Sequence, residues 1–308
     1  MFRSRPPARS PRPRSGSHAP LDAFAAPARG WADLWRTLAG LVLIVVLTAT
    51  GYRLFGQYLD LRYGPLIAGA IAWAMVNGST PGGMLLLLYS FLLPATAVLA
   101  VTRGLHGRPA GTLFGQSPRR VAGDALRVAA PMLALAVATL PFGLADPAVV
   151  AHLSPWTTLA YLPAALPAIL VQTGSEELLF RGYLLQQLAA RFRSPVGWML
   201  LPSALFAAGH YAPETYGADA PFVAAWAGLF GLAAADLTAR TGGIGAAIGL
   251  HFATNAAAFL LVGLAGSLDG LAVWVRPHGP DAGLSGLLAV DLMAMFVGWL
   301  MARVVLRV

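Results

Sequence analysis

Long apolar runs alternate with short polar gaps along most of the chain. Most runs approach the length of about 20 residues that a helix needs to cross the hydrocarbon of a bilayer. Helices are expected because backbone groups in lipid must bond within their own segment, and the strict alternation of a barrel strand is absent. The pattern therefore predicts an all-α fold, a polytopic transmembrane helical bundle, with runs at about 37–55, 65–77, 82–101, 126–145, 157–174, 196–210, 221–239, 243–266 and 284–302.

The positions of the arginines orient this bundle. Arginine is concentrated in the gaps near 103–120 and 191–193, at 240 and near the C-terminus, whereas acidic residues occupy the gaps near 214 and 269. Cytoplasmic loops carry the excess of basic residues, so the arginine-rich gaps are expected to be cytoplasmic. A cytoplasmic N-terminus then requires that the short run 65–77 be re-entrant or interfacial. The prediction is about eight spans around a polar intramembrane cavity, with both termini in the cytoplasm.

Composition supports a membrane protein and excludes several other classes. The chain is 57% hydrophobic and only 11% charged, against about 25% charged residues in ordinary soluble domains. Its net charge of +8 comes from arginine without lysine, which suits orientation and attraction to anionic lipid, whereas no folded basic face indicates nucleic acid. The absence of cysteine excludes disulfides, thiolate metal sites and cysteine nucleophiles. We expect an integral protein of the bacterial plasma membrane.

The first 30 residues differ in composition from the rest. They are rich in proline, arginine, serine and alanine. Such a composition does not build a core, so this segment is expected to be a disordered cytoplasmic tail.

Two adjacent glutamates are the most unusual feature of the apolar runs. Glu176 and Glu177 follow Thr173-Gly174-Ser175, a stretch that could break the helix and recap it at Ser175. On a helix, Arg181 lies four residues after Glu177 and can pair with it, which leaves Glu176 free to titrate. Burial raises the pKa of a carboxylate toward the range useful to a general base. A structural ion pair that holds two helices together is the alternative interpretation of the same residues.

Two histidines also lie in apolar runs. His210 follows Phe206 by one helical turn, and Asn255 follows His251 by one turn, so each pair shares a helix face. A single histidine in such a run is more often a hydrogen-bonded packing residue. At a rise of about 1.5 Å per residue, Glu176 and both histidines fall within the bilayer rather than at opposite surfaces, so they could converge. Ionisable groups at such depths are costly and usually functional.

These motifs resemble a known family. Glu176-Glu177-x-x-x-Arg181, Phe206-x-x-x-His210 and His251-x-x-x-Asn255 occur in the order that is found in the CAAX protease and bacteriocin-processing (CPBP, or Abi) family of intramembrane endopeptidases. The resemblance covers about 126–266. It implies that 126–266 is the catalytic core. The chain is then expected to divide into the tail at 1–30, N-terminal transmembrane segments at 31–125, this core and a C-terminal transmembrane helix within 267–308.

The resemblance also implies a mechanism. In the family's glutamate-type mechanism the first glutamate and the middle histidine activate a water molecule, so Glu176 would be the general base, assisted by His210. His251 and Asn255 would donate hydrogen bonds to the tetrahedral oxyanion. Glu177, Arg181 and Phe206 would support these four catalytic residues. The substrate would be a membrane-associated protein or peptide.

The expected cofactor is none, with zinc as the alternative. Glu176, His210 and His251 would form a His₂Glu set with an open position for water. The compact H-E-x-x-H motif of many zinc peptidases is absent, and this favours the metal-independent route.

Two other functions remain open from the sequence. Intramembrane carboxylates and histidines also serve proton- or ion-coupled transporters, and Asp236 and Asp291 lie in apolar runs. Asp236 precedes Arg240 by four residues and is expected to pair with it, whereas Asp291 could face a neighbouring helix. A transporter often has inverted repeats, and none is visible. A non-catalytic scaffold of the same fold would not need a base, two histidines and an asparagine together.

Overall fold

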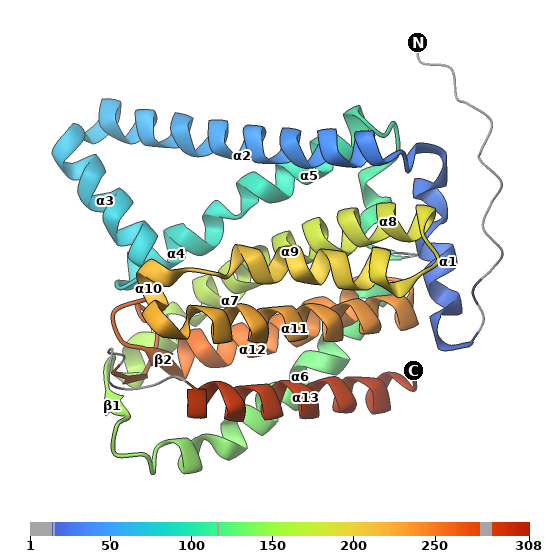
Figure 1. The fold of residues 1–308 in the computed structure, drawn as a ribbon. Helices are drawn as coiled ribbons and strands as arrows, with labels where there is room; N and C mark the ends of the chain where they lie inside the picture. The colour runs from blue at the N-terminus through green and yellow to red at the C-terminus, as the bar shows by residue number, and fades with distance from the viewer. Residues whose placement is uncertain (1–13, 15, 116, 278–284) are drawn as a thin grey trace.

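The computed structural model describes residues 14, 16–115, 117–277 and 285–308. Long helices lie roughly side by side, with their ends gathered at two opposite ends of the molecule (Figure 1). The polytopic helical bundle predicted from the apolar runs is confirmed. Its α-helices are α1 (Ala19–Ala25), α2 (Leu34–Tyr63), α3 (Pro65–Asn77), α4 (Pro81–Ser90), α5 (Leu92–Gly104), α6 (Pro118–Gly143), α7 (Pro155–Glu177), α8 (Gln186–Arg191), α9 (Leu201–Gly209), α10 (Pro213–Tyr216), α11 (Ala220–Thr241), α12 (Gly245–Leu260) and α13 (Ser285–Leu306).

Shorter helical segments connect these elements. Two of them are π-helices, η4 (Leu178–Leu185) and η5 (Val196–Leu200), and each continues directly into an α-helix. The remaining segments are 3₁₀-helices, namely η1 (Gly16–His18), η2 (Ala26–Trp31), η3 (Ala110–Leu113) and η6 (Gly217–Asp219).

Several helices can cross a membrane. In the described part of the chain, 5 helical stretches are long and apolar enough for this, namely Leu34–Tyr63, Pro81–Gly104, Ala110–Gly143, Pro213–Thr241 and Ala289–Leu306. Shorter apolar helices occupy Pro65–Asn77, Val196–Gly209 and Gly245–Leu260. The count of about eight spans therefore stays a prediction. Helix α3 lies obliquely at one end of the bundle, between the end of α2 and the start of α4 (Figure 1), and its re-entrant or interfacial placement stays a prediction.

A small sheet adds to the all-α prediction. Strands β1 (Val150–Ala151), β2 (Val262–Leu264) and β3 (Trp274–Arg276) form a sheet of order β1-β3-β2. β1 pairs antiparallel with β3, with Val150 opposite Val275, and β2 pairs parallel with β3, with Gly263 opposite Val275. The sheet lies at the end of the bundle where α10 is found (Figure 1). Strands of two or three residues are too short to give a period-two pattern in the sequence.

The prediction of a disordered N-terminal tail over residues 1–30 is wrong for 16–30, which are helical, whereas residues 1–13 and 15 lie outside the described residues. Helix α1 docks on α8 and α11, and Gln186 Nε2 donates to the carbonyl oxygen of Phe24 at 2.7 Å. Composition hid a periodic signal in this segment. Its buried residues follow helical spacing, and together they form an apolar stripe of Leu21, Phe24, Ala25 and Ala28.

Helices α6 and α12 approach each other through glycine. A Cβ atom on Gly245 would lie 2.3 Å from the carbonyl oxygen of Val121, and one on Gly249 would lie 2.4 Å from that of Ala125. The two glycines are four residues apart and share one face of α12, so they let the backbones come close. This contact fixes the position of the helix that carries His251.

Candidate active site

An ion pair between Glu177 and Arg181 forms the base of the site. Arg181 Nη1 donates to Glu177 Oε1 at 2.8 Å, as the spacing predicted, and the side chains are only 2% and 0% exposed. The guanidinium also donates to the carbonyl oxygen of Gly231 at 3.2 Å. It lies over the rings of Phe206 and Phe230, 4.9 and 5.7 Å from their centroids. The charge is thus enclosed by one carboxylate and two aromatic faces, a favourable setting for a buried cation.

The predicted helix break at Ser175 is wrong. Helix α7 runs without interruption through 173–175 to Glu177, and the irregularity begins one residue later with the π-helix η4. A π-helix widens the backbone turn, and such segments are frequent at functional sites. The helix that carries the glutamates therefore continues past them through a wider π-helical turn. The residue pattern contained no signal for this π-helix.

His251 lies between the two glutamates. Its Nδ1 is 2.8 Å from Glu177 Oε1, and its Nε2 is 3.5 Å from Glu176 Oε2. Because Glu177 Oε1 also accepts from Arg181, one carboxylate oxygen joins an arginine on η4 to a histidine on α12. Glu177 therefore orients His251 directly. The sequence had predicted only a general supporting role for Glu177.

Glu176 differs from Glu177 in its access to the surroundings. The Glu176 side chain is 17% exposed, whereas that of Glu177 is 0% exposed. The Oε2 atom of each is buried and has no hydrogen-bond partner among the residues that the structure describes. Burying a carboxylate oxygen without such a partner is costly, and this cost is tolerated chiefly where the group has a function. Glu176 is the one of the two that a water molecule or a substrate can reach.

Asn255 pairs with a residue that the sequence had not singled out. Asn255 Nδ2 donates to Gln172 Oε1 at 2.8 Å. Gln172 lies one turn before Glu176 on α7, and Asn255 lies one turn after His251 on α12, so the two contacts form neighbouring steps between antiparallel helices. In the sequence, the four-residue spacing places Gln172 on the same helix face as Glu176. The sequence does not show which helix packs against that face, so the contact with Asn255 could not be predicted.

His210 reaches the site through Phe206. Its Nδ1 is 2.8 Å from the carbonyl oxygen of Phe206, and the two rings are 4.4 Å apart. The Phe206 ring, in turn, is 6.1 Å from the His251 ring. Among the described residues no ion pair joins His210 to Glu176 or Glu177. Phe206, which is 2% exposed, thus separates the two histidines and contacts both.

The alternative zinc set does not assemble in this structure. Within the described part of the chain, no group of three or more His, Asp or Glu side chains is placed to hold a metal ion. Glu176 and His251 are neighbours, but His210 is on the other side of Phe206 and its Nδ1 is engaged by the backbone. These residues as placed do not fit the tetrahedral His₂Glu geometry of zinc.

The two intramembrane aspartates lie away from this site. Arg240 Nε donates to both oxygens of Asp236, at 2.7 and 2.8 Å, as predicted from their spacing. Trp299 Nε1 donates to the same carboxylate at 3.0 Å, so Asp236 ties α11 to α13. Asp291 is exposed on α13, and its position facing a neighbouring helix stays a prediction.

Comparison with known proteins identifies the segment that carries these residues. Residues 156–257 match the family model described as type II CAAX prenyl endopeptidase Rce1-like. This segment is Rce1-like. It includes all of the predicted site residues, from Glu176 to Asn255, and the family resemblance expected from the three motifs is confirmed.

One curated relative matches about a third of the chain. The uncharacterized protein YyaK of Bacillus subtilis (strain 168) is 37% identical over 99 residues. The match covers 30% of this chain and 31% of the relative, so it spans about a third of that protein. No solved structure matches the chain.

Proposed function

We propose that the protein is an intramembrane endopeptidase that hydrolyses a peptide bond of a membrane-associated protein or peptide. The observation that carries this proposal is the position of Glu176. Its Oε2 atom is buried, has no hydrogen-bond partner in the described part of the chain and lies 3.5 Å from His251 Nε2, yet its side chain remains 17% exposed. A carboxylate of this kind is suited to accept a proton from a water molecule. The Rce1-like match of the surrounding segment supports the same chemistry.

Each of the four residues has a distinct role in this proposal. Glu176 takes the proton of the attacking water, and His210 assists it. The Nδ1–H of His210 donates to the carbonyl oxygen of Phe206, so its Nε2 is the acceptor of the neutral ring. His251 and Asn255 stabilise the oxyanion by donating hydrogen bonds as negative charge develops.

The contacts of His251 define what its donor role requires. Its Nδ1 lies 2.8 Å from Glu177 Oε1 and donates to that carboxylate oxygen, so donation to the oxyanion requires a second proton on Nε2, the atom that lies 3.5 Å from Glu176 Oε2. Asn255 is held by Gln172 through one of its two amide hydrogens, so the other is left for the substrate.

The substrate and the orientation belong to the same proposal. The family description names a CAAX prenyl endopeptidase, so a prenylated C-terminal peptide is the first substrate to test. The arginine-rich ends of the helices are the proposed cytoplasmic face. In Figure 1 this is the end that holds α1 and the C-terminus, opposite the small sheet.

The test is cleavage of fluorogenic peptides, prenylated and unprenylated, by purified protein in detergent. Glu176→Gln should abolish turnover and preserve folding, because it removes the base while retaining the side-chain volume. Glu214→Gln is the matched control, since Glu214 is an exposed glutamate of α10. Each protein is assayed with and without a chelator.

Three outcomes distinguish the alternatives. Activity that is lost only in Glu176→Gln and is insensitive to chelator supports the glutamate mechanism. If the wild-type protein also loses activity in the presence of chelator, the reaction requires a metal ion. Retained turnover in Glu176→Gln would remove Glu176 from the mechanism, and the transporter and scaffold hypotheses would then be tested by flux and binding assays.

A further inference from the structure

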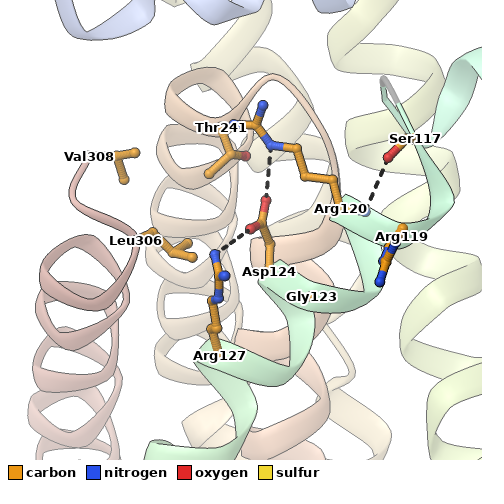
Figure 2. Close-up of a pocket in the computed structure, with 9 residues that line it drawn as sticks. All are labelled: Ser117, Arg119, Arg120, Gly123, Asp124, Arg127, Thr241, Leu306 and Val308. Carbon is orange, nitrogen blue, oxygen red and sulfur yellow. Dashed lines mark hydrogen bonds and ion pairs between the residues drawn. The ribbon is translucent and has the colours of Figure 1, made fainter.

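A second site lies where α6, α11 and α13 meet, away from the glutamates. A cavity of about 430 Å³ opens there between the start of α6 and the end of α13 (Figure 2). None of the predicted catalytic residues lines it. Its lining residues are Ser117, Arg119, Arg120, Gly123, Asp124, Arg127, Thr241, Leu306 and Val308.

Positive charge in this cavity exceeds negative charge. Counting side chains, three arginines and one aspartate leave a net charge of +2. Asp124 is shared by Arg120 at 3.7 Å and Arg127 at 4.0 Å, as Figure 2 shows. These distances are longer than the 2.7–2.9 Å of a strong charge-assisted hydrogen bond. Two guanidinium groups therefore keep most of their donors available, and their side chains are 56% and 67% exposed.

The cavity lies at the charged ends of two apolar helices. The apolar stretch Ala289–Leu306 ends at a residue that lines the cavity, and the lining residues of α6 occupy the first turns of that helix, before its longest apolar run. Next to arginines in the sequence, Leu126 on α6 and Val304 on α13 are 69% and 76% exposed. Side chains of this kind next to a basic site suit an amphiphilic ligand, whose acyl chains would cover them while its anionic group meets the arginines.

We propose that this cavity binds a phosphate-bearing anion and that its source is an anionic membrane lipid. Arginine is suited to this task because its planar guanidinium offers paired donors to phosphate oxygens. Asp124 lies between Arg120 and Arg127 (Figure 2) and offsets part of their charge. The acyl chains lie along the exposed apolar side chains of α6 and α13.

Native mass spectrometry of the full chain measures this binding directly. The protein is released from neutral detergent and titrated with phosphatidylglycerol, phosphatidylcholine or inorganic phosphate. We expect one phosphatidylglycerol to bind saturably, and phosphatidylcholine to bind about tenfold more weakly. The double variant Arg120→Gln/Arg127→Gln should lose about tenfold or more in affinity, since each arginine near a membrane surface contributes a severalfold effect.

Two further variants make the test specific. Arg103→Gln/Arg191→Gln removes two exposed arginines at the same end of the bundle and should bind phosphatidylglycerol as the wild type does. Asp124→Asn removes the carboxylate and should tighten binding severalfold, a gain that misfolding does not produce. Equal losses in both double variants, or unchanged binding in Arg120→Gln/Arg127→Gln, would overturn the site. Displacement of the lipid by millimolar inorganic phosphate would overturn the lipid as its source.

Discussion

Replacing Glu177 by glutamine tests whether the buried ion pair holds the bundle together. The substitution keeps the side-chain volume but removes the charge that faces Arg181 Nη1 at 2.8 Å. At an effective dielectric constant of about 20, the Coulomb attraction over that distance is roughly 6 kcal/mol, and desolvation offsets part of it. Because Arg181 is only 2% exposed, water cannot replace the lost carboxylate. We expect Glu177→Gln to lower the free energy of unfolding by about 3–5 kcal/mol.

A double-mutant cycle separates the ion pair from other effects of substitution. Arg181→Met should cost about as much as Glu177→Gln, because it strands the carboxylate. The double variant removes both charges and should lose less than the sum of the single variants, with a coupling energy of about 2–4 kcal/mol. The free energy of unfolding is measured in mixed micelles as the fraction of SDS is raised, with tryptophan fluorescence as the signal.

A second ion pair with the same spacing provides the control. Asp236 and Arg240 are also four residues apart, but their side chains are 12% and 14% exposed. Asp236 keeps Trp299 as a donor when Arg240 is replaced. Arg240→Gln should therefore cost only about 1 kcal/mol. If Glu177→Gln costs no more than this control, or if the two single effects simply add, the buried pair does not stabilise the fold as reasoned.

Three further predictions follow from other contacts. Burial, reinforced by a neighbouring arginine, lowers the pKa of His106 from 6.5 to about 4. As the pH falls, the unfolded chain therefore binds a proton at His106 before the folded chain does. The free energy of unfolding should be at its maximum above pH 6.5 and fall by about 3 kcal/mol towards pH 4. His106→Gln should flatten this dependence when unfolding is measured across pH. Gly249→Ala should lower the free energy of unfolding by about 1–3 kcal/mol, because the added methyl group overpacks the contact with α6. Gly69→Ala is the control, since no described atom lies within 4 Å of the added Cβ, and it should leave the free energy of unfolding unchanged or raise it. Asn255→Ala should lower kcat more than it raises KM, because an oxyanion donor acts in the transition state. Gln172→Ala should show a weaker effect of the same kind, and a pure KM effect in steady-state assays would contradict this role.

The sequence by itself determined the features that depend on local geometry. The apolar runs correspond closely to the helices because each segment must satisfy its own backbone in lipid. The pairs Glu177–Arg181 and Asp236–Arg240 follow from the four-residue spacing of neighbours on one helix face. The apolar stripe of α1 was also present in the sequence, but the proline- and arginine-rich composition around it concealed the signal.

Tertiary structure alone decided how these local pieces meet. The placement of His251 between two glutamates and the contact of Asn255 with Gln172 depend on the antiparallel register of α7 and α12. That register is set by packing among several helices, including the glycine contact with α6, and no local pattern encodes it. The π-helix after Glu177 and the position of Phe206 between the histidines have the same origin. Local sequence fixes which side chains a helix presents on each face, but the partner of each face is selected by the packing of the whole bundle.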